Sequence, residues 1–111
     1  MNCLFCKIVS GEMKTPLVYQ DEHVVAFNDI APQAPHHILI IPKKHTEAVS
    51  DWAKEDALLA GKMIMAAKEI AEQEGIGKSG YKLLFRVGRD GGQEVGHIHL
   101  HLMGGKNMAD L

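Results

Sequence analysis

The run His97-Ile98-His99-Leu100-His101-Leu102-Met103 alternates three histidines with apolar residues. Successive side chains of a β-strand point to opposite faces, so this alternation predicts a strand with all three imidazoles on one face. Ile98, Leu100 and Leu102 then point the other way, into a core. Histidine has the unperturbed pKa nearest to neutrality, and its ring can serve as acid, base, nucleophile or ligand. We therefore expect the functional site on the histidine face of this strand.

Four further apolar segments predict strands at residues 17–20, 23–27, 37–41 and 81–87. Between the third and the fourth, apolar residues recur at steps of four, three and four, which predicts one long helix over residues 52–74. Ser50 or Asp51 is expected to cap its start, and Gly75 and Gly77 to end it. Residues 4–9 predict a short helix or turn. This order predicts an α+β fold, a five-stranded antiparallel sheet with the long helix packed on one face.

The composition limits the class of protein. The 111 residues suffice for a single domain over residues 1–111. The net charge of −2 leaves no electrostatic footprint for nucleic acid or for an anionic membrane surface. No apolar run approaches the roughly 18 residues of a membrane span, and no signal-peptide pattern is present. Cys3 and Cys6 are too close in sequence for a secreted disulfide framework, so we expect a cytoplasmic protein.

Three interpretations of the histidine run are open. The histidines could form the solvent-exposed face of a half-buried strand, a set of metal ligands, or a catalytic group in which one imidazole is the nucleophile. The preceding Gly91-Gly92-Gln93-Glu94 predicts a turn whose backbone N–H groups converge on an anion. An anion site beside neutral imidazoles favours phosphoryl or nucleotidyl transfer, although such a loop is also common as a plain hairpin turn.

Cys3-Leu4-Phe5-Cys6 has the spacing of half a zinc site. The chain has no other cysteine, so histidines would supply the remaining ligands, and His45 and one member of the histidine run are the candidates. The alternative is a pair of small, buried apolar side chains. A thioredoxin-like redox role is disfavoured because no βαβ pattern precedes the pair.

Two other positions carry polar side chains next to apolar ones. Asp29 follows Phe27 at a strand end, a combination that suits a base slot with an acceptor for ribose hydroxyls, although such an aspartate is also a common turn former. His37 shares the inward face of its strand with Leu39 and Ile41. It is either a core histidine whose ring nitrogens are hydrogen-bonded within the protein, or a residue that positions the side chains of the functional site.

Several of these segments together resemble the histidine triad (HIT) family, in its histidine triad nucleotide-binding (Hint) branch. They are Gly91-Gly92-Gln93, His97-x-His99-x-His101, residues 27–35 and Ile40-Ile41-Pro42-Lys43-Lys44-His45. The resemblance covers nearly the whole chain. It implies a homodimer whose α+β subunits join their sheets into one. It also implies a purine nucleotide substrate and hydrolysis of purine nucleoside phosphoramidates through a nucleotidyl-histidine intermediate.

The resemblance also implies roles for individual residues. His99 resembles the nucleophile, and His101 the histidine that contacts the phosphate and helps the leaving group depart. The remaining substrate contacts are expected from Phe5, Phe27 and Ile30 around the base, from Asp29 on the ribose, and from Gln93 with the backbone of Glu94 and Val95 on the phosphate. Members with an N-terminal Cys-x-x-Cys bind a structural zinc, which here implies the ligands Cys3, Cys6, His45 and His97.

The chain departs from the family pattern at three positions. Arg86 stands where the Hint branch usually has an asparagine near the scissile bond, and is expected to contact phosphate oxygens or to favour a longer phosphate chain. Glu94 replaces a hydroxyl residue, and Gly96 an aromatic one. The alternatives to a phosphoramidase are a dinucleoside polyphosphate hydrolase, a nucleotide-binding protein with little turnover, and a hydrolase with catalytic zinc.

Overall fold

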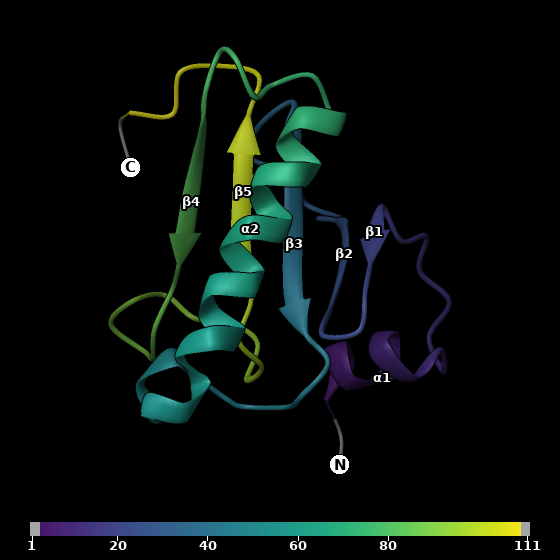
Figure 1. Ribbon diagram of the computed structural model, residues 1–111, viewed down its shortest axis with the longest axis vertical. Helices are drawn as coiled ribbons and strands as arrows, with labels where there is room; N and C mark the ends of the chain where they lie inside the picture. Colours follow the sequence, from purple (N-terminus) through teal and green to yellow (C-terminus); the bar gives the residue numbers. More distant parts are fainter. Residues whose placement is uncertain (1–2, 110–111) are drawn as a thin grey trace.

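The computed structural model describes residues 3–109. Within that range five antiparallel strands form one sheet in the order β1-β2-β3-β5-β4 (Figure 1). The strands are β1 (Tyr19–Gln20), β2 (Val24–Asn28), β3 (His36–Pro42), β4 (Tyr81–Phe85) and β5 (Leu100–Gly104). The helices are α1 (Leu4–Ser10) and α2 (Ala57–Gln73), and two short 3₁₀ turns, η1 (Val49–Asp51) and η2 (Lys54–Asp56), precede α2. The predicted α+β class is confirmed, with its five-stranded antiparallel sheet, one long helix and a short N-terminal helix.

Each face of the sheet has its own apolar core, because side chains alternate between faces along every strand. On one face α2 packs Met63, Ala66 and Ile70 against sheet residues that include Ile38, Ile40, Ile98, Leu100 and Leu102. On the other face α1 packs Phe5 and Ile8 against Val25, Phe27, Leu39 and Ile41. No helix within residues 3–109 has the length and apolar character needed to cross a membrane. Leu100 and Leu102 thus anchor β5 to the α2 face, and Ile98 anchors the segment just before it.

The strand with the histidines lies inside the sheet. β5 pairs with β3 on one side and with β4 on the other, and His101 lies opposite Leu39 and Leu84. On the same face, His37 of β3 lies opposite Met103. A central strand cannot shift its register without moving both neighbours, so β5 is a rigid support for functional side chains.

Several predicted boundaries are wrong: the strand predicted over residues 17–20 begins at Tyr19, and the strand predicted over residues 81–87 ends at Phe85. The long helix begins at Ala57, because residues 49–56 form the turns η1 and η2, and Trp52 between them has extended backbone with ψ 146. The expected caps Ser50 and Asp51 therefore lie in η1. The side chain of Asp56 accepts a hydrogen bond from the Ala53 N–H (2.9 Å) and holds the second turn. At the other end Gly75 ends the helix with φ +79, as predicted.

The predicted strand over residues 97–103 begins later, at Leu100. His97 and Ile98 are hydrogen-bonded outside the sheet ladder, through His97 N–H to Val95 O (2.9 Å) and Ile98 N–H to Thr46 O (2.9 Å). Only the last of the three histidines therefore lies in the regular strand.

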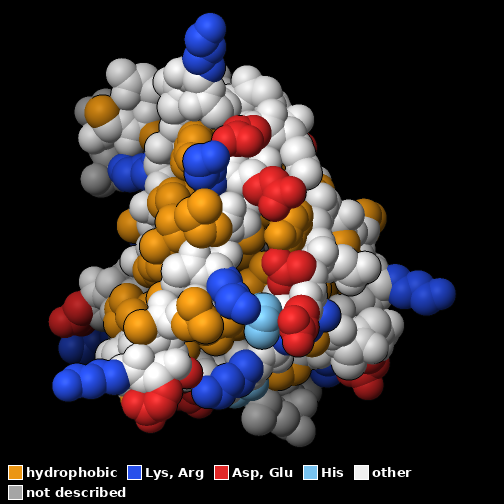
Figure 2. Space-filling model, in the orientation of Figure 1, with side chains coloured by type: hydrophobic (Ala, Val, Ile, Leu, Met, Phe, Trp, Pro, Cys, Tyr) orange, Lys and Arg blue, Asp and Glu red, His pale blue; other side chains and the backbone are white. Residues whose placement is uncertain are grey.

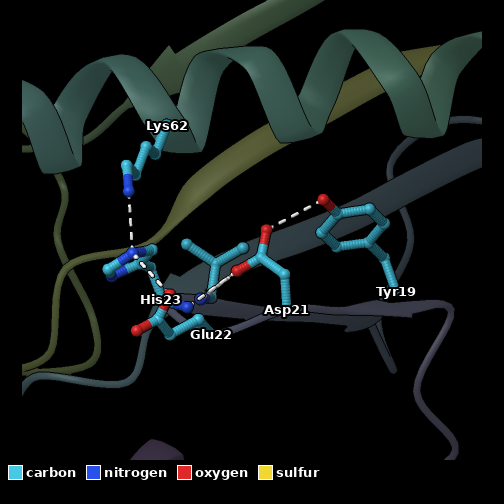
Figure 3. A network of polar contacts seen from close by, with 6 residues as sticks. Tyr19, Asp21, Glu22, His23 and Lys62 are labelled. Atoms are coloured by element: carbon cyan, nitrogen blue, oxygen red, sulfur yellow. Dashed lines mark hydrogen bonds and ion pairs between the residues drawn. The ribbon is translucent and has the colours of Figure 1, made fainter.

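A polar network fixes the turn between β1 and β2 (Figure 3). Asp21 Oδ1 accepts hydrogen bonds from the N–H groups of His23 (2.7 Å) and Val24 (2.9 Å), and Tyr19 donates its hydroxyl to Oδ2 (2.8 Å). That bond to Asp21, together with burial, raises the pKa of Tyr19 to about 12, so the hydroxyl is a permanent donor. From α2, Lys62 Nζ contacts His23 Nε2 at 2.7 Å. The network holds the hairpin in place, and through it β2, which carries Phe27.

Met63 and Met65 of α2 allow a matched test of the packing on this face. Met63 is fully buried, whereas Met65 is 61% exposed. We expect Met63→Ala to lower the free energy of unfolding by about 2–4 kcal/mol because it leaves a cavity, and Met65→Ala to change it by about 0.5 kcal/mol or less. Denaturant unfolding of both variants measures the difference. Equal losses would contradict the assigned orientation of α2.

Candidate active site

The three histidines of the run lie on the face opposite α2, as the alternation predicted. All three are buried. The ring of Phe5, from α1, meets both His97 and His99 edge to face, at centroid separations of 5.9 and 5.2 Å. His101 lies beside His99, with ring centroids 5.0 Å apart. The histidines therefore form one continuous group beneath α1, but each has different partners.

The ring of His97 faces two cysteines and a second histidine. Its Nδ1 lies 3.4 Å from Cys3 Sγ, 3.6 Å from Cys6 Sγ and 3.2 Å from His45 Nδ1, and Cys6 Sγ lies 3.2 Å from His45 Nδ1. On its other side Nε2 donates to the carbonyl of Pro42 (2.8 Å), which leaves the lone pair on Nδ1. Burial lowers the pKa of His97 and favours the neutral ring that a metal requires.

This cluster of Cys3, Cys6, His45 and His97 fits a metal ion. The four donor atoms lie within 4.8 Å of one another and come from α1 with its N-cap and from the segments after β3 and before β5. Tetrahedral zinc with bonds of about 2.0–2.3 Å places its ligand atoms roughly 3.3–3.8 Å apart, close to the spacings found here. Two thiols and two imidazoles are also the donor set that zinc prefers. All four predicted ligands are thus brought together.

His99 is held in one tautomer by the backbone. Its Nδ1–H donates to the carbonyl of His97 (2.8 Å), so the neutral ring carries its lone pair on Nε2. That second nitrogen accepts no hydrogen bond from any group within residues 3–109. An imidazole oriented in this way has the arrangement of an activated nucleophile.

His101 carries its proton on the opposite nitrogen, because of a chain of hydrogen bonds that begins at the backbone. The N–H of Gln33 donates to His37 Nδ1 (3.0 Å), which puts the His37 proton on Nε2. His37 Nε2–H then donates to His101 Nδ1 (2.9 Å), with Asp29 Oδ2 a further 3.4 Å contact of Nε2. The neutral His101 therefore keeps its hydrogen on Nε2, a buried atom without a partner among the described residues.

The charge state of His101 agrees with this assignment. Burial, followed by the nearby His99, His37 and Arg86, lowers its pKa to about 4. Burial also lowers the pKa of His37. Both rings are therefore neutral at pH 7. Two ring nitrogens are therefore available to a ligand. His99 Nε2 carries a lone pair, and His101 Nε2 carries a hydrogen that it can donate.

His37 is the site residue that the sequence left undecided between core and support. The pairing of His37 with Met103 puts its ring beside that of His101, at a centroid separation of 5.2 Å. Asp29 lies at the end of β2, where Oδ1 accepts from the Ala31 N–H (2.8 Å) and Oδ2 faces His37. The alternation on β3 indicated that His37 points inward, but its partner depended on the strand register.

The loop over residues 88–95, here called the glycine loop, forms several hydrogen bonds within itself. Gly92 N–H donates to Arg89 O (3.0 Å) and Gln93 N–H to Gly88 O (3.0 Å). The side chain of Gln93 accepts from Gly88 N–H (2.9 Å) and donates to Val95 O (2.9 Å). Within residues 3–109 the N–H groups of Glu94 and Val95 donate no hydrogen bond. Gly91 N–H also donates none within that range, so the anion site expected of this loop has available N–H groups at Gly91 and at residues 94–95.

The apolar residues predicted around the base differ in position. Phe5 and Phe27 are buried and meet edge to face at 5.5 Å, in the core beside the histidines. Val95 packs against the same core. Ile30 is 99% exposed, so it has no part in that core. Arg86 follows β4 and lies near His37 and His101, since its charge contributes to lowering the pKa of both.

Residues 10–108 match the sequence profile of the HIT domain. The chain belongs to the HIT family. It is 49% identical over 108 residues to the purine nucleoside phosphoramidase of Escherichia coli strain K12. The aligned region covers 97% of this chain and 91% of that protein. Among solved structures, the HIT family hydrolase of Legionella pneumophila Philadelphia 1 matches with a TM-score of 0.94, at 50% identity over 96% of each chain. A histidine triad protein of Clostridium difficile matches with a TM-score of 0.96, at 39% identity over 100% of this chain and 96% of that one.

The lowered pKa of His101 predicts an acid dependence of stability. Between about pH 6.5 and pH 4 the unfolded chain binds a proton at this position that the folded HIT protein does not, so the free energy of unfolding falls as the pH falls. His101→Gln removes that difference and keeps an acceptor for His37. We expect thermal or urea unfolding to show a loss of unfolding free energy between pH 7 and pH 5 that is about 2 kcal/mol smaller in the variant. Between pH 7 and pH 9 the two slopes should agree. An unchanged acid slope would contradict a neutral His101.

Proposed function

We propose that this HIT protein hydrolyses purine nucleoside phosphoramidates, with His99 as the nucleophile. The observation that carries the proposal is the opposite proton placement on the two adjacent rings, a lone pair on His99 Nε2 and a hydrogen on His101 Nε2. The 49% identity to a purine nucleoside phosphoramidase supports the same substrate class. His37 acts as a positioning residue, because it sets the tautomer of His101.

The reaction proceeds in two displacements at phosphorus. In the first, the lone pair of His99 Nε2 attacks phosphorus and the P–N bond breaks. The leaving nitrogen takes one proton from solvent and departs as the amine, and His99 becomes a nucleotidylated imidazolium. In the second, water attacks phosphorus, the bond to Nε2 breaks, and the nucleoside monophosphate leaves with neutral His99 restored. Of the two protons of that water, one replaces the proton taken up when the P–N bond broke, and the other converts the released amine to its ammonium form.

The surrounding groups stabilise the phosphoryl charge. His101 Nε2–H and the N–H groups of Glu94 and Val95 donate hydrogen bonds to the phosphoryl oxygens, and they are arranged before substrate binds. The carbonyl of His97 stabilises the imidazolium that forms on His99, because it already accepts the Nδ1–H. Asp29 binds the ribose, and the buried Phe5 and Phe27 lie beside the purine.

We also propose that Cys3, Cys6, His45 and His97 hold a structural zinc ion. A closed four-ligand zinc supplies rigidity and no chemistry. The residues themselves tie α1 to the segments after β3 and before β5, and so hold Phe5 against His99. Thiol ligands of this kind suit a reducing compartment, which agrees with the cytoplasm.

The assembly we propose is a single HIT domain over residues 1–111 that forms a homodimer. The outer edge of β4 pairs with no strand among the described residues, and an antiparallel pairing with a second β4 would continue the sheet. Figure 2 shows hydrophobic side chains gathered over the α2 side of the molecule, where Leu58, Ile64 and Met65 are exposed. Both features support association with a second copy.

The nucleophile is tested with a labelled adenosine phosphoramidate. We expect the wild-type chain to carry the nucleotide on His99 in a rapidly quenched reaction, and His99→Ala to lower kcat/KM by roughly 10³-fold or more. His36→Ala, at a half-exposed histidine paired with Glu74, is the matched control. Label on another histidine, or turnover that survives His99→Ala, would overturn the mechanism.

The zinc ion is tested by metal analysis and thermal unfolding. We expect purified protein to contain about one zinc per chain, and both His45→Gln and Cys6→Ser to lose it and to melt several degrees lower, because the ion binds only the folded state. His23→Gln, at a histidine outside the cluster, should keep the metal. A chain that contains no zinc and melts at the same temperature with and without a chelator would refute the proposal.

A further inference from the structure

Arg86 lies on the histidine face, beside the proposed nucleophile. The register of the β4–β5 pair ends with Phe85 opposite Leu100, and continued by one residue it sets Arg86 opposite His99. Residues opposite each other in an antiparallel pair project on the same side of the sheet. The guanidinium also borders the glycine loop, since Nη1 is 3.5 Å from the point where a Cβ on Gly92 would lie.

The guanidinium is a half-buried cation without a counterion. Among residues 3–109 no carboxylate pairs with Arg86 and no group accepts a hydrogen bond from it. Five N–H donors are therefore available in a geometry that matches a carboxylate or phosphate. Arg89 in the same loop differs, because it is exposed and pairs with Asp90 at 3.0 Å. The free donors of Arg86 indicate that its partner is a ligand.

The order of strands indicates which part of the substrate reaches Arg86. Phe27 and Asp29, proposed to bind the nucleoside, come from β2 and its end, while His99 and His101 come from β5 and the segment before it. Neighbouring strands lie about 4.8 Å apart, so a substrate laid across β2, β3 and β5 extends next over β4. Arg86 follows β4, and it therefore lies at the end of the substrate that departs.

We propose that Arg86 binds an anionic group on the leaving amine, so that the site prefers nucleoside phosphoramidates whose amine carries a carboxylate or a phosphate. The inference rests on the function proposed above and names the substrate class within it. The phosphoryl group that all substrates share already has donors in His101 Nε2–H and the loop N–H groups. A bidentate pair with an arginine then distinguishes one leaving group from another.

Three adenosine monophosphate amides test the proposal. The first carries β-alanine, the second the uncharged amide of β-alanine, and the third 2-aminoethyl phosphate. For each we measure kcat/KM with the wild-type chain, with Arg86→Gln, and with Arg89→Gln as the control that removes a loop charge elsewhere. The ratio of interest is kcat/KM for a substrate with a charged amine divided by kcat/KM for the substrate with the uncharged amine. We expect Arg86→Gln to lower this ratio by roughly ten- to hundredfold and Arg89→Gln to leave it unchanged. Comparing ratios between variants cancels the intrinsic reactivity of each amine.

Each outcome decides the matter. A fall in the ratio for the carboxylate alone, the phosphate alone, or both supports the proposal and identifies the anion. An equal fall in kcat/KM for all three substrates would overturn it, because Arg86 would then serve the shared phosphoryl group. If the wild-type chain cleaves none of the three, the proposed function itself fails. Arg86→Lys, which keeps the charge but not the bidentate fork, should give an intermediate ratio and carries the test if Arg86→Gln does not fold.

Discussion

The hydrogen bond from His99 Nδ1–H to the carbonyl of His97 is the interaction on which the site depends. It fixes the lone pair of His99 on the nitrogen that faces the site, without any acidic side chain. The residue that supplies this carbonyl is itself held through its ring, by the Pro42 carbonyl on one side and by the cysteine and histidine cluster on the other. A movement of the cluster would therefore reach the nucleophile through a single residue.

The three histidines become unequal because their rings meet different acceptors and donors. His97 bonds to a carbonyl through Nε2 and His99 through Nδ1, whereas His101 accepts at Nδ1 from His37. The direction of the bond from His37 to His101 is set by the Gln33 N–H, which donates to His37 Nδ1, because a backbone N–H can only donate. The backbone thus assigns the tautomer of each ring, and burial keeps His101 neutral while it does so.

The alternation of faces was correctly predicted from the sequence, and the cluster of Cys3, Cys6, His45 and His97 was predicted through the family resemblance. The start of α2 and the partner of His37 were not predicted. Alternation over residues 97–103 predicted the two faces because the period of two is a property of the strand itself. The start of α2 was missed because η2 depends on the bond from Ala53 N–H to Asp56. The contact of His37 with His101 joins residues 64 apart, and no local pattern reports the register of β3 against β5. The contact of Gln93 with phosphate stays a prediction, and its side-chain amide hydrogen-bonds to Gly88 and Val95 within its own loop.

The place of β5 between β3 and β4 has a consequence for folding. The last strand in the sequence is a central strand of the sheet, and its pairing with β3 joins residues about sixty positions apart. Such non-local pairing is slow to form, and until β5 inserts, β3 and β4 each expose an unpaired edge. The residues that carry the chemistry thus lie in and before a strand whose pairing with β3 is non-local and slow to form. The insertion of β5 between β3 and β4 therefore completes the sheet and positions the histidines at the same time.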